Sequence, residues 1–154
     1  MEIKEIKKGD ELRNIESVIQ KLGTEFLNEA RINEKFNSKV FVSMWESLLK
    51  NRSGIVFIAV DSIKGVVGMI GGLRYNNFIS GKSVLSEAFW FVKKENRGCG
   101  IKLLKNLEKW ANDNEVEQII LSHFLLLNSD ILDKLYKKWG YKPIETNYIK
   151  NLGG

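Results

Sequence analysis

Residues 97–102 have the composition of a phosphate-binding turn. They read Arg-Gly-Cys-Gly-Ile-Lys and stand between a hydrophobic run at 89–92 and an amphipathic helical pattern. The first N–H groups of a helix lack acceptors within the helix, and the helix dipole favours negative charge there. Glycines let the backbone approach an anion closely. The segment therefore predicts a phosphate site, although two glycines that only turn the chain would leave the same pattern.

The single cysteine and the single histidine limit the other chemistry that the chain could perform. No disulfide can form within the chain, and a zinc site or a nucleophile–histidine pair would need Cys99 or His123. We therefore expect no metal site, and a reducing compartment, the cytoplasm. The net charge of +5 suits an anionic partner, but the basic residues are spread along the chain, which argues against a dedicated nucleic-acid binder. No apolar run approaches the roughly 20 residues that span a bilayer, and the first residues lack the apolar core of a secretion signal.

The hydrophobic pattern predicts one α/β domain over residues 1–154. Helical spacing predicts helices at 10–22, 24–30, 38–49, 98–112 and 130–138. Gly23 is expected to end the first of them. Alternating or continuous apolar runs predict strands at 55–60, 66–75, 84–93 and 118–123, with turns at 61–65 and 76–82 and two short strands within 141–151. This order indicates a mixed α/β sheet with helices on both faces.

Two segments resemble motifs of the GNAT superfamily of N-acetyltransferases. Residues 97–102 resemble its pyrophosphate motif, Arg/Gln-x-x-Gly-x-Gly/Ala, with Arg97 first, Gly100 as the middle glycine and Lys102 departing from the last small residue. Residues 135–141, Leu-Tyr-Lys-Lys-Trp-Gly-Tyr, resemble the later pattern Leu-Tyr-x-x-x-Gly-Phe/Tyr. The resemblance covers about residue 55 to the C-terminus. It implies a mixed, mostly antiparallel central sheet that splays between its fourth and fifth strands.

The resemblance also implies acetyl-CoA as the acyl donor. Its pantetheine arm would lie between strands 84–93 and 118–123 and pair with backbone groups of Trp90, Phe91 and Val92, with the Val92 amide stabilising an oxyanion. The pyrophosphate would be bound beside Arg97 by the amides of Gly98, Cys99, Gly100, Ile101 and Lys102. Asn128 could contact the cofactor or simply cap a helix.

Three titratable residues are candidates for proton transfer in such an enzyme, in which the amine attacks the thioester directly. Tyr136 occupies the motif tyrosine and would protonate the leaving thiolate; it could instead be a core aromatic. Glu87 is the acidic residue of an apolar strand, and burial would raise its pKa toward that of a useful base; a solvent-facing residue or an anchor for the substrate amine are the alternatives. His123 ends the run at 119–121 and is a second candidate base or a structural residue.

The sequence thus predicts a cytoplasmic N-acetyltransferase that acts on an amine of a small molecule or peptide. Acceptor specificity would come from residues 26–45 and 75–82, and Glu25, Glu29 and Glu34 could attract a cationic amine or be ordinary surface charges. A homodimer is compatible with the resemblance. A CoA-binding sensor without turnover stays open because of Lys102 and the unidentified base. A basic nucleic-acid-binding domain is the third reading, for which the sequence has no motif.

Overall fold

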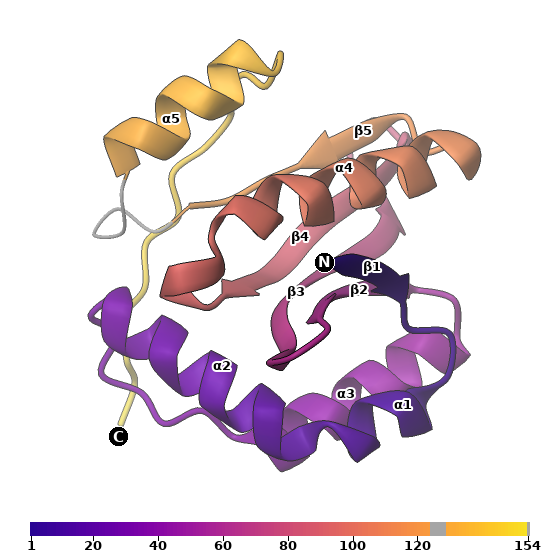
Figure 1. The fold of residues 1–154 in the computed structure, drawn as a ribbon. Coiled ribbons are helices and arrows are strands. Elements are labelled where there is room, and N and C mark those ends of the chain that lie inside the picture. The colour runs from indigo at the N-terminus through magenta and orange to yellow at the C-terminus, as the bar shows by residue number, and fades with distance from the viewer. Residues whose placement is uncertain (124–128, 154) are drawn as a thin grey trace. The chain divides into compact units, whose positions relative to one another are not determined.

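The structure is a computed structural model that describes residues 1–123 and 129–153 (Figure 1). It forms two compact units, Met1–Ser122 and His123–Gly154, which are described separately. In the described parts of the chain, none of the helices has the length and apolar character needed to cross a bilayer.

The first unit is built on a five-stranded sheet with the strand order β1-β2-β3-β4-β5. Antiparallel pairing joins the first four strands, β1 (Glu2–Glu5), β2 (Gly54–Asp61), β3 (Gly65–Asn76) and β4 (Ser83–Val92). β5 (Gln118–Ile120) pairs parallel to β4 and is shorter than the predicted strand 118–123. The mixed, mostly antiparallel sheet is thereby confirmed.

The two predicted hairpin turns are also confirmed. In the first, Asp61 Oδ1 accepts the backbone N–H groups of Ile63 and Lys64, both at 2.9 Å, and Gly65 has a φ of +73°. Asn77 Oδ1 closes the second turn in the same way. β1 is an edge strand that the sequence pattern did not predict, because three of its four residues are charged.

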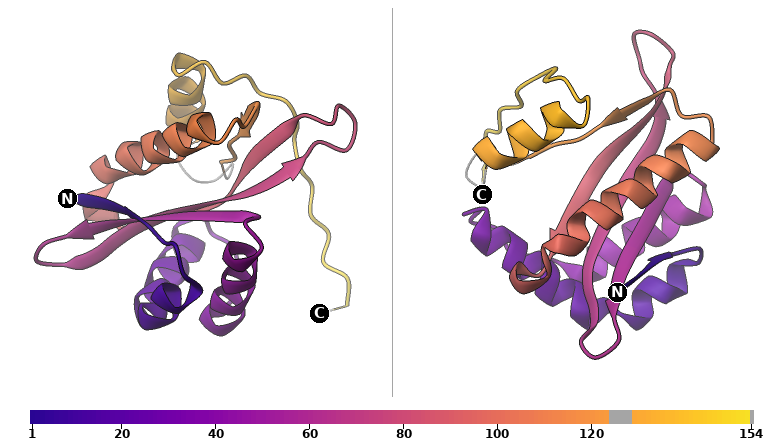
Figure 2. Two further views of the ribbon diagram at one scale, coloured as in Figure 1. Left: turned by 90° about the vertical axis from the view of Figure 1, so that its right-hand side faces the viewer. Right: turned by 45° about the horizontal axis from the view of Figure 1, so that its top comes forward.

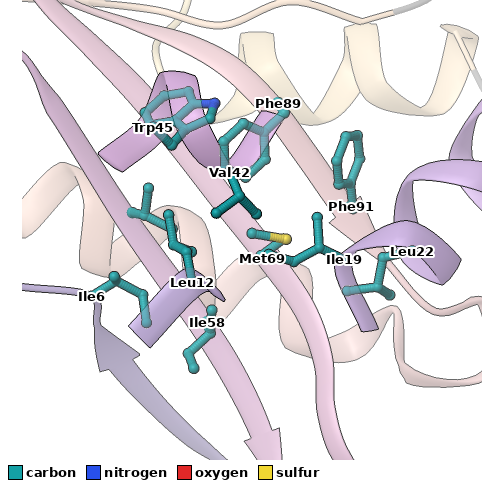
Figure 3. Close-up of a cluster of buried hydrophobic side chains, with 11 residues drawn as sticks. Ile6, Leu12, Ile19, Leu22, Val42, Trp45, Ile58, Met69, Phe89 and Phe91 are labelled. Atoms are coloured by element: carbon teal, nitrogen blue, oxygen red, sulfur yellow. The ribbon is translucent and has the colours of Figure 1, made fainter. Parts of the chain in front are cut away.

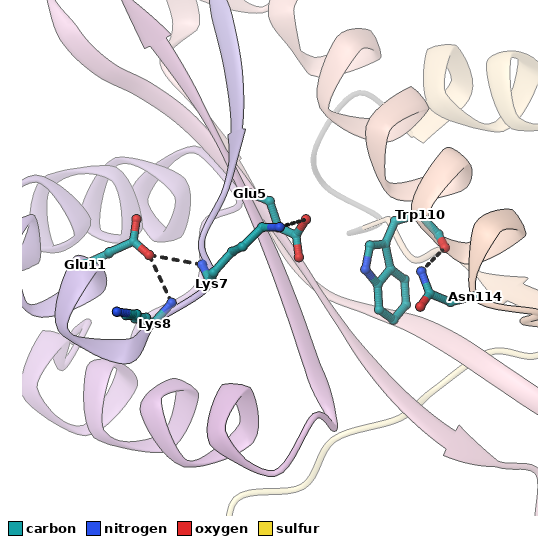
Figure 4. Close-up of polar contacts among 6 residues, drawn as sticks. All are labelled: Glu5, Lys7, Lys8, Glu11, Trp110 and Asn114. Carbon is teal, nitrogen blue, oxygen red and sulfur yellow. Dashed lines mark hydrogen bonds and ion pairs between the residues drawn. The ribbon is translucent and has the colours of Figure 1, made fainter.

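Helices cover both faces of this sheet (Figure 2). One face carries α1 (Gly9–Asn14), α2 (Glu16–Glu29) and α3 (Ser38–Lys50), and the other carries α4 (Gly98–Asp113). α1 begins where Glu11 Oε1 accepts the N–H groups of Lys7 and Lys8, and at the far end of α4 the Asn114 side chain donates to the carbonyl of Trp110 (Figure 4). The first contact satisfies N–H groups at the helix start, and the second adds to the Asn114 backbone N–H that the Trp110 carbonyl already accepts.

The predicted helix break at Gly23 is wrong, because α2 runs through it without interruption. A Cβ on Gly23 would lie 2.2 Å from a ring carbon of Phe36. The glycine therefore allows Phe36 to pack directly against the helix backbone.

The main core lies between the first three helices and the sheet (Figure 3). Part of this core is a cluster of aromatic rings. Phe89 on β4 contacts Trp45 edge to face with ring centroids 4.9 Å apart, and the ring centroids of Phe91 and Phe26 are 5.0 Å apart. Each such pair adds about 0.5–1.5 kcal/mol beyond the burial of its area. This cluster anchors the second half of β4 to α2 and α3.

The second unit contains α5 (Ser129–Lys138) and an extended C-terminal segment. The two strands predicted within 141–151 are wrong, because residues 141–153 contain no strand. Large apolar side chains of this segment are exposed, namely Ile144, Tyr148, Ile149 and Leu152.

Candidate active site

β4 and β5 separate after three pairs of residues. Val84, Leu85 and Ser86 pair with Gln118, Ile119 and Ile120. Beyond Ser86, β4 continues to Val92 with β3 on one side, and within the described residues no strand pairs with it on the other. The predicted splay between the fourth and fifth strands is therefore confirmed. We call this unpaired edge, residues 87–92, the open side of β4.

The backbone of Trp90 and Val92 faces the open side. The Lys93 N–H donates to the Val67 carbonyl of β3 at 2.9 Å. Successive residues of a strand direct their N–H and C=O groups to opposite sides, so Val92 and Trp90 direct theirs away from β3. Phe91 pairs with Met69 of β3, and its ring is buried in the aromatic cluster. Of the three predicted backbone ligands, Trp90 and Val92 can thus pair with an extended ligand, whereas Phe91 holds the strand in place.

A β-bulge sets the direction of Glu87. Gly71 pairs with Phe89 and Gly72 with Glu87, so Ala88 has no partner on β3. Paired residues of antiparallel strands project to the same face, and the consecutive Gly71 and Gly72 project to opposite faces. Glu87 therefore lies on the face opposite Phe89, away from the aromatic cluster. A regular strand would have directed the carboxyl into that cluster.

The Glu87 carboxyl is held at the point where the two strands separate. Its Oε2 accepts the backbone N–H of Ser122, two residues beyond β5, at 3.2 Å. Burial raises the pKa of Glu87 from its ordinary value of 4.5 to about 7, while the Ser122 hydrogen bond acts in the opposite direction. Such a carboxyl can accept and release a proton near neutral pH, as a general base must. Sequence reasoning missed Ser122, because a backbone donor has no residue signature.

The first turn of α4 presents uncapped amides. The short 3₁₀ helix η1 (Lys94–Asn96) leads to Arg97, whose side chain makes no capping hydrogen bond, and the turn contains no acidic residue. Gly100 N–H donates to the Arg97 carbonyl at 2.9 Å, which leaves Gly98 and Cys99 as the amides without acceptors in the helix. A Cβ on Gly98 would meet no described atom within 4 Å. This geometry suits a bound anion.

The remaining residues of that turn differ in exposure. Ile101 and Lys102 are exposed, and Cys99 is buried. Burial raises the pKa of the Cys99 thiol, so at neutral pH it is protonated and not a nucleophile. A shallow hollow of about 270 Å³ lies beside the turn, lined by Met1, Glu95, Asn96, Gly98, Cys99 and Lys102.

Arg97 forms an ion pair with Glu29, the last residue of α2. From the sequence, Glu29 is expected to be a surface charge or an attractant for a cationic amine. Its pairing with Arg97 could not be predicted, because the two residues are 68 positions apart in the chain.

Tyr136 and His123 lie together in the second unit. Their ring centroids are 5.9 Å apart, and Tyr136 also contacts the rings of Trp139 and Tyr141. Tyr136 is buried, and His123 Nδ1 is buried without a hydrogen-bond partner among the described residues. Asn128 lies outside the described residues.

Comparison with known proteins agrees with this geometry. The sequence profile described as the acetyltransferase (GNAT) family matches residues 16–141. A search of curated protein sequences finds no match.

Similar solved structures include three acetyltransferases. An aminoglycoside acetyltransferase from an uncultured soil metagenomic sample has a TM-score of 0.73 at 15% identity, with 99% of this chain and 98% of that chain covered. A ribosomal-protein-alanine N-acetyltransferase from Brucella melitensis biovar Abortus has a TM-score of 0.67 at 16% identity, with 99% and 100% covered. A Trypanosoma brucei acetyltransferase has a TM-score of 0.69 at 17% identity, with 98% and 99% covered. At these identities the likeness concerns the fold, while the profile covers most of the sequence. The chain therefore belongs to the GNAT acetyltransferase family.

Proposed function

We propose that this protein is an acetyl-CoA-dependent N-acetyltransferase that transfers an acetyl group directly to an amine of a small molecule or peptide. The observation that supports this most is the open side of β4, where Trp90 and Val92 direct backbone groups outward. An uncapped helix N-terminus follows at Gly98. A strand edge next to such a terminus suits an extended arm with amide groups that ends in a diphosphate.

The first unit presents the types of chemical group that would bind coenzyme A. Acetyl-CoA would supply the acetyl group as an activated thioester. Trp90 and Val92 would bind the pantetheine arm as a neighbouring strand would, and the Val92 N–H would stabilise the oxyanion. The diphosphate would be bound by the first turn of α4, with Arg97 as a cation and with backbone groups of Gly98, Cys99, Gly100, Ile101 and Lys102. Asn128 stays a proposed cofactor contact.

Proton transfer is assigned to three titratable side chains. The Glu87 carboxylate would accept a proton from the ammonium group of the acceptor. Its pKa of about 7 suits this task. Tyr136 would donate its hydroxyl proton to the leaving thiolate, since a phenol and a thiol have comparable acidities. The phenolate would regain a proton from the acylated nitrogen, which must release one to become the amide. His123 is the alternative base. No enzyme nucleophile is needed, in keeping with the protonated, buried Cys99.

The acceptor is proposed by class alone, as an amine. Two proteins of similar fold are named as an aminoglycoside acetyltransferase and as a ribosomal-protein-alanine N-acetyltransferase, which supports testing both kinds of acceptor. A panel of acceptors should therefore include aminoglycosides, polyamines, amino acids and peptides with free N-termini.

Calorimetry with acetyl-CoA and free CoA tests the cofactor, and thiol release with the amine panel tests turnover. Binding of both forms together with thiol release on at least one amine supports the proposal. Binding without turnover on any amine would favour the CoA-binding sensor, for which the departure at Lys102 is the sequence argument. Well-folded protein that binds neither form refutes both.

A single domain over residues 1–154, a cytoplasmic location and a homodimer complete the proposal. Four exposed apolar side chains in the C-terminal segment, at Ile144, Tyr148, Ile149 and Leu152, favour association with a second copy. Light scattering over a range of concentrations measures the oligomeric state directly.

A further inference from the structure

The ion pair between Arg97 and Glu29 joins the two faces of the sheet. Arg97 stands at the start of α4, on one face, and Glu29 ends α2, on the other (Figures 1 and 2). The side chains are 43% and 30% exposed, so the pair lies at the surface, next to the uncapped first turn of α4.

Glu29 orients the Arg97 guanidinium without saturating it. Its Oε2 binds the Arg97 Nη2 alone, and among the described residues the Nε and Nη1 groups have no hydrogen-bond partner. The second long-range arginine–glutamate pair of the first unit is different. Arg13 binds Glu46 through two parallel hydrogen bonds, from Nε and Nη2, at 2.8 and 2.7 Å. The Arg13 guanidinium is thus bound by both carboxylate oxygens of Glu46, whereas Arg97 keeps donors available for another anion.

The charges around Arg97 explain why a carboxylate is needed there. The positive end of the α4 dipole lies at Arg97, and the neighbouring positions carry Lys93, Lys94 and Lys102 against the single acidic Glu95. A guanidinium on a long flexible side chain would be repelled from this position. Glu29 offsets that repulsion and restricts the rotamers of Arg97, so less freedom is lost when an anion binds.

We propose that Glu29 is a positioning residue for the diphosphate of the cofactor, acting through Arg97. It holds the guanidinium at the first turn of α4 with Nε and Nη1 ready to donate. This inference rests on the proposed function, since it needs coenzyme A as the ligand. It assigns the end of α2 to cofactor binding and not to the attraction of a cationic acceptor.

The test is a double-mutant cycle of Glu29→Gln and Arg97→Gln, read by calorimetry with free CoA. Glu29→Gln is expected to raise the Kd about three- to fivefold, in the upper part of the effect of a partly exposed ion pair. In the Arg97→Gln background the same change should have no further effect, because Glu29 acts through Arg97. Glu29→Asp keeps a carboxylate and should restore part of the affinity.

Glu46→Gln is the matched control. It breaks an ion pair of similar exposure, 57% and 28%, away from α4. It should change Tm at least as much as Glu29→Gln and leave the Kd for CoA unchanged. A general loss of folding would affect both variants, so the comparison separates positioning from stability.

The outcomes distinguish this inference from the proposed function. If wild-type protein binds CoA and Glu29→Gln leaves the Kd unchanged or lowers it, the positioning inference is wrong and the function stands. The inference is equally wrong if Glu29→Gln weakens binding to the same extent with and without Arg97. If folded wild-type protein does not bind CoA, the proposed function fails first.

Discussion

The Glu87 carboxylate accepts a hydrogen bond from the backbone N–H of Ser122, with Oε2 and N 3.2 Å apart, where β4 and β5 stop pairing. One ionisable oxygen thus bridges the two strands at the beginning of the open side of β4. The bulge at Ala88 is what makes the contact available, because it directs Glu87 away from the aromatic cluster of Phe89.

The first prediction concerns the pH dependence of turnover. Only the ionised carboxylate accepts a proton, so kcat/KM should rise with pH through about 7. Glu87→Gln should lower kcat/KM by about 100-fold or more. The rise in kcat/KM through about pH 7 that is due to Glu87 should be absent from the pH profile of the variant. Glu117→Gln is the control, because Glu117 also accepts a strand N–H, that of Ser83 at 2.8 Å, at the other end of the same strand pair. A wild-type rate and pH profile for Glu87→Gln would rule Glu87 out as the base.

The second prediction concerns stability. The Glu87 carboxyl ionises near 4.5 in the unfolded chain and near 7 in the folded protein. Between these values the unfolded chain has released the proton that the folded protein retains, so rising pH favours unfolding. The stabilising contribution of the neutral Glu87 carboxyl is fully present below about pH 4.5 and is lost as the pH rises through about 7. In urea denaturation, the free energy of unfolding of Glu87→Gln relative to that of wild type should therefore increase from about pH 4.5 to 7 and stay constant above 7. A difference that stays constant across this range would contradict the raised pKa.

The third prediction concerns the first turn of α4. A methyl group on Gly98 meets no described atom within 4 Å, so Gly98→Ala should fold normally and gain up to about 1 kcal/mol in free energy of unfolding. If a diphosphate lies against this backbone, the same methyl should weaken CoA binding about tenfold or more. Lys105→Ala, on the exposed side of the same helix, should leave the Kd within about twofold. Unchanged CoA affinity in a stable Gly98→Ala protein would place the diphosphate elsewhere.

The fourth prediction concerns Tyr136. Phenylalanine keeps the ring contacts with His123, Trp139 and Tyr141 and removes only the hydroxyl. Tyr136→Phe should retain CoA binding and lose about 100-fold in kcat, because the thiolate then lacks its proton donor. Tyr141→Phe changes a ring of the same cluster and should keep kcat. Equal rates for wild type and Tyr136→Phe would make Tyr136 a core residue.

Local patterns in the sequence determined several elements of this protein. Asp61 and Gly65 specify a turn through short-range hydrogen bonds and a positive φ, and the glycines before residue 101 mark the start of α4. The apolar periods of β2, β3, β4 and α4 depend on neighbours a few residues away. For the same reason the motifs at 97–102 and 135–141 together indicated the family.

The tertiary structure alone decided how these elements meet. The sequence predicts a helix stop at Gly23, whereas the glycine makes room for the ring of Phe36, which lies outside that helix. The face of Glu87 depends on the register between β3 and β4, and the pairing of Arg97 with Glu29 joins residues 68 positions apart. Register and ion pairs arise from contacts between distant segments, which are established only when the chain folds. The sequence thus indicated where an anion could bind, and the fold decided that Glu87 contacts Ser122 and that Glu29 pairs with Arg97.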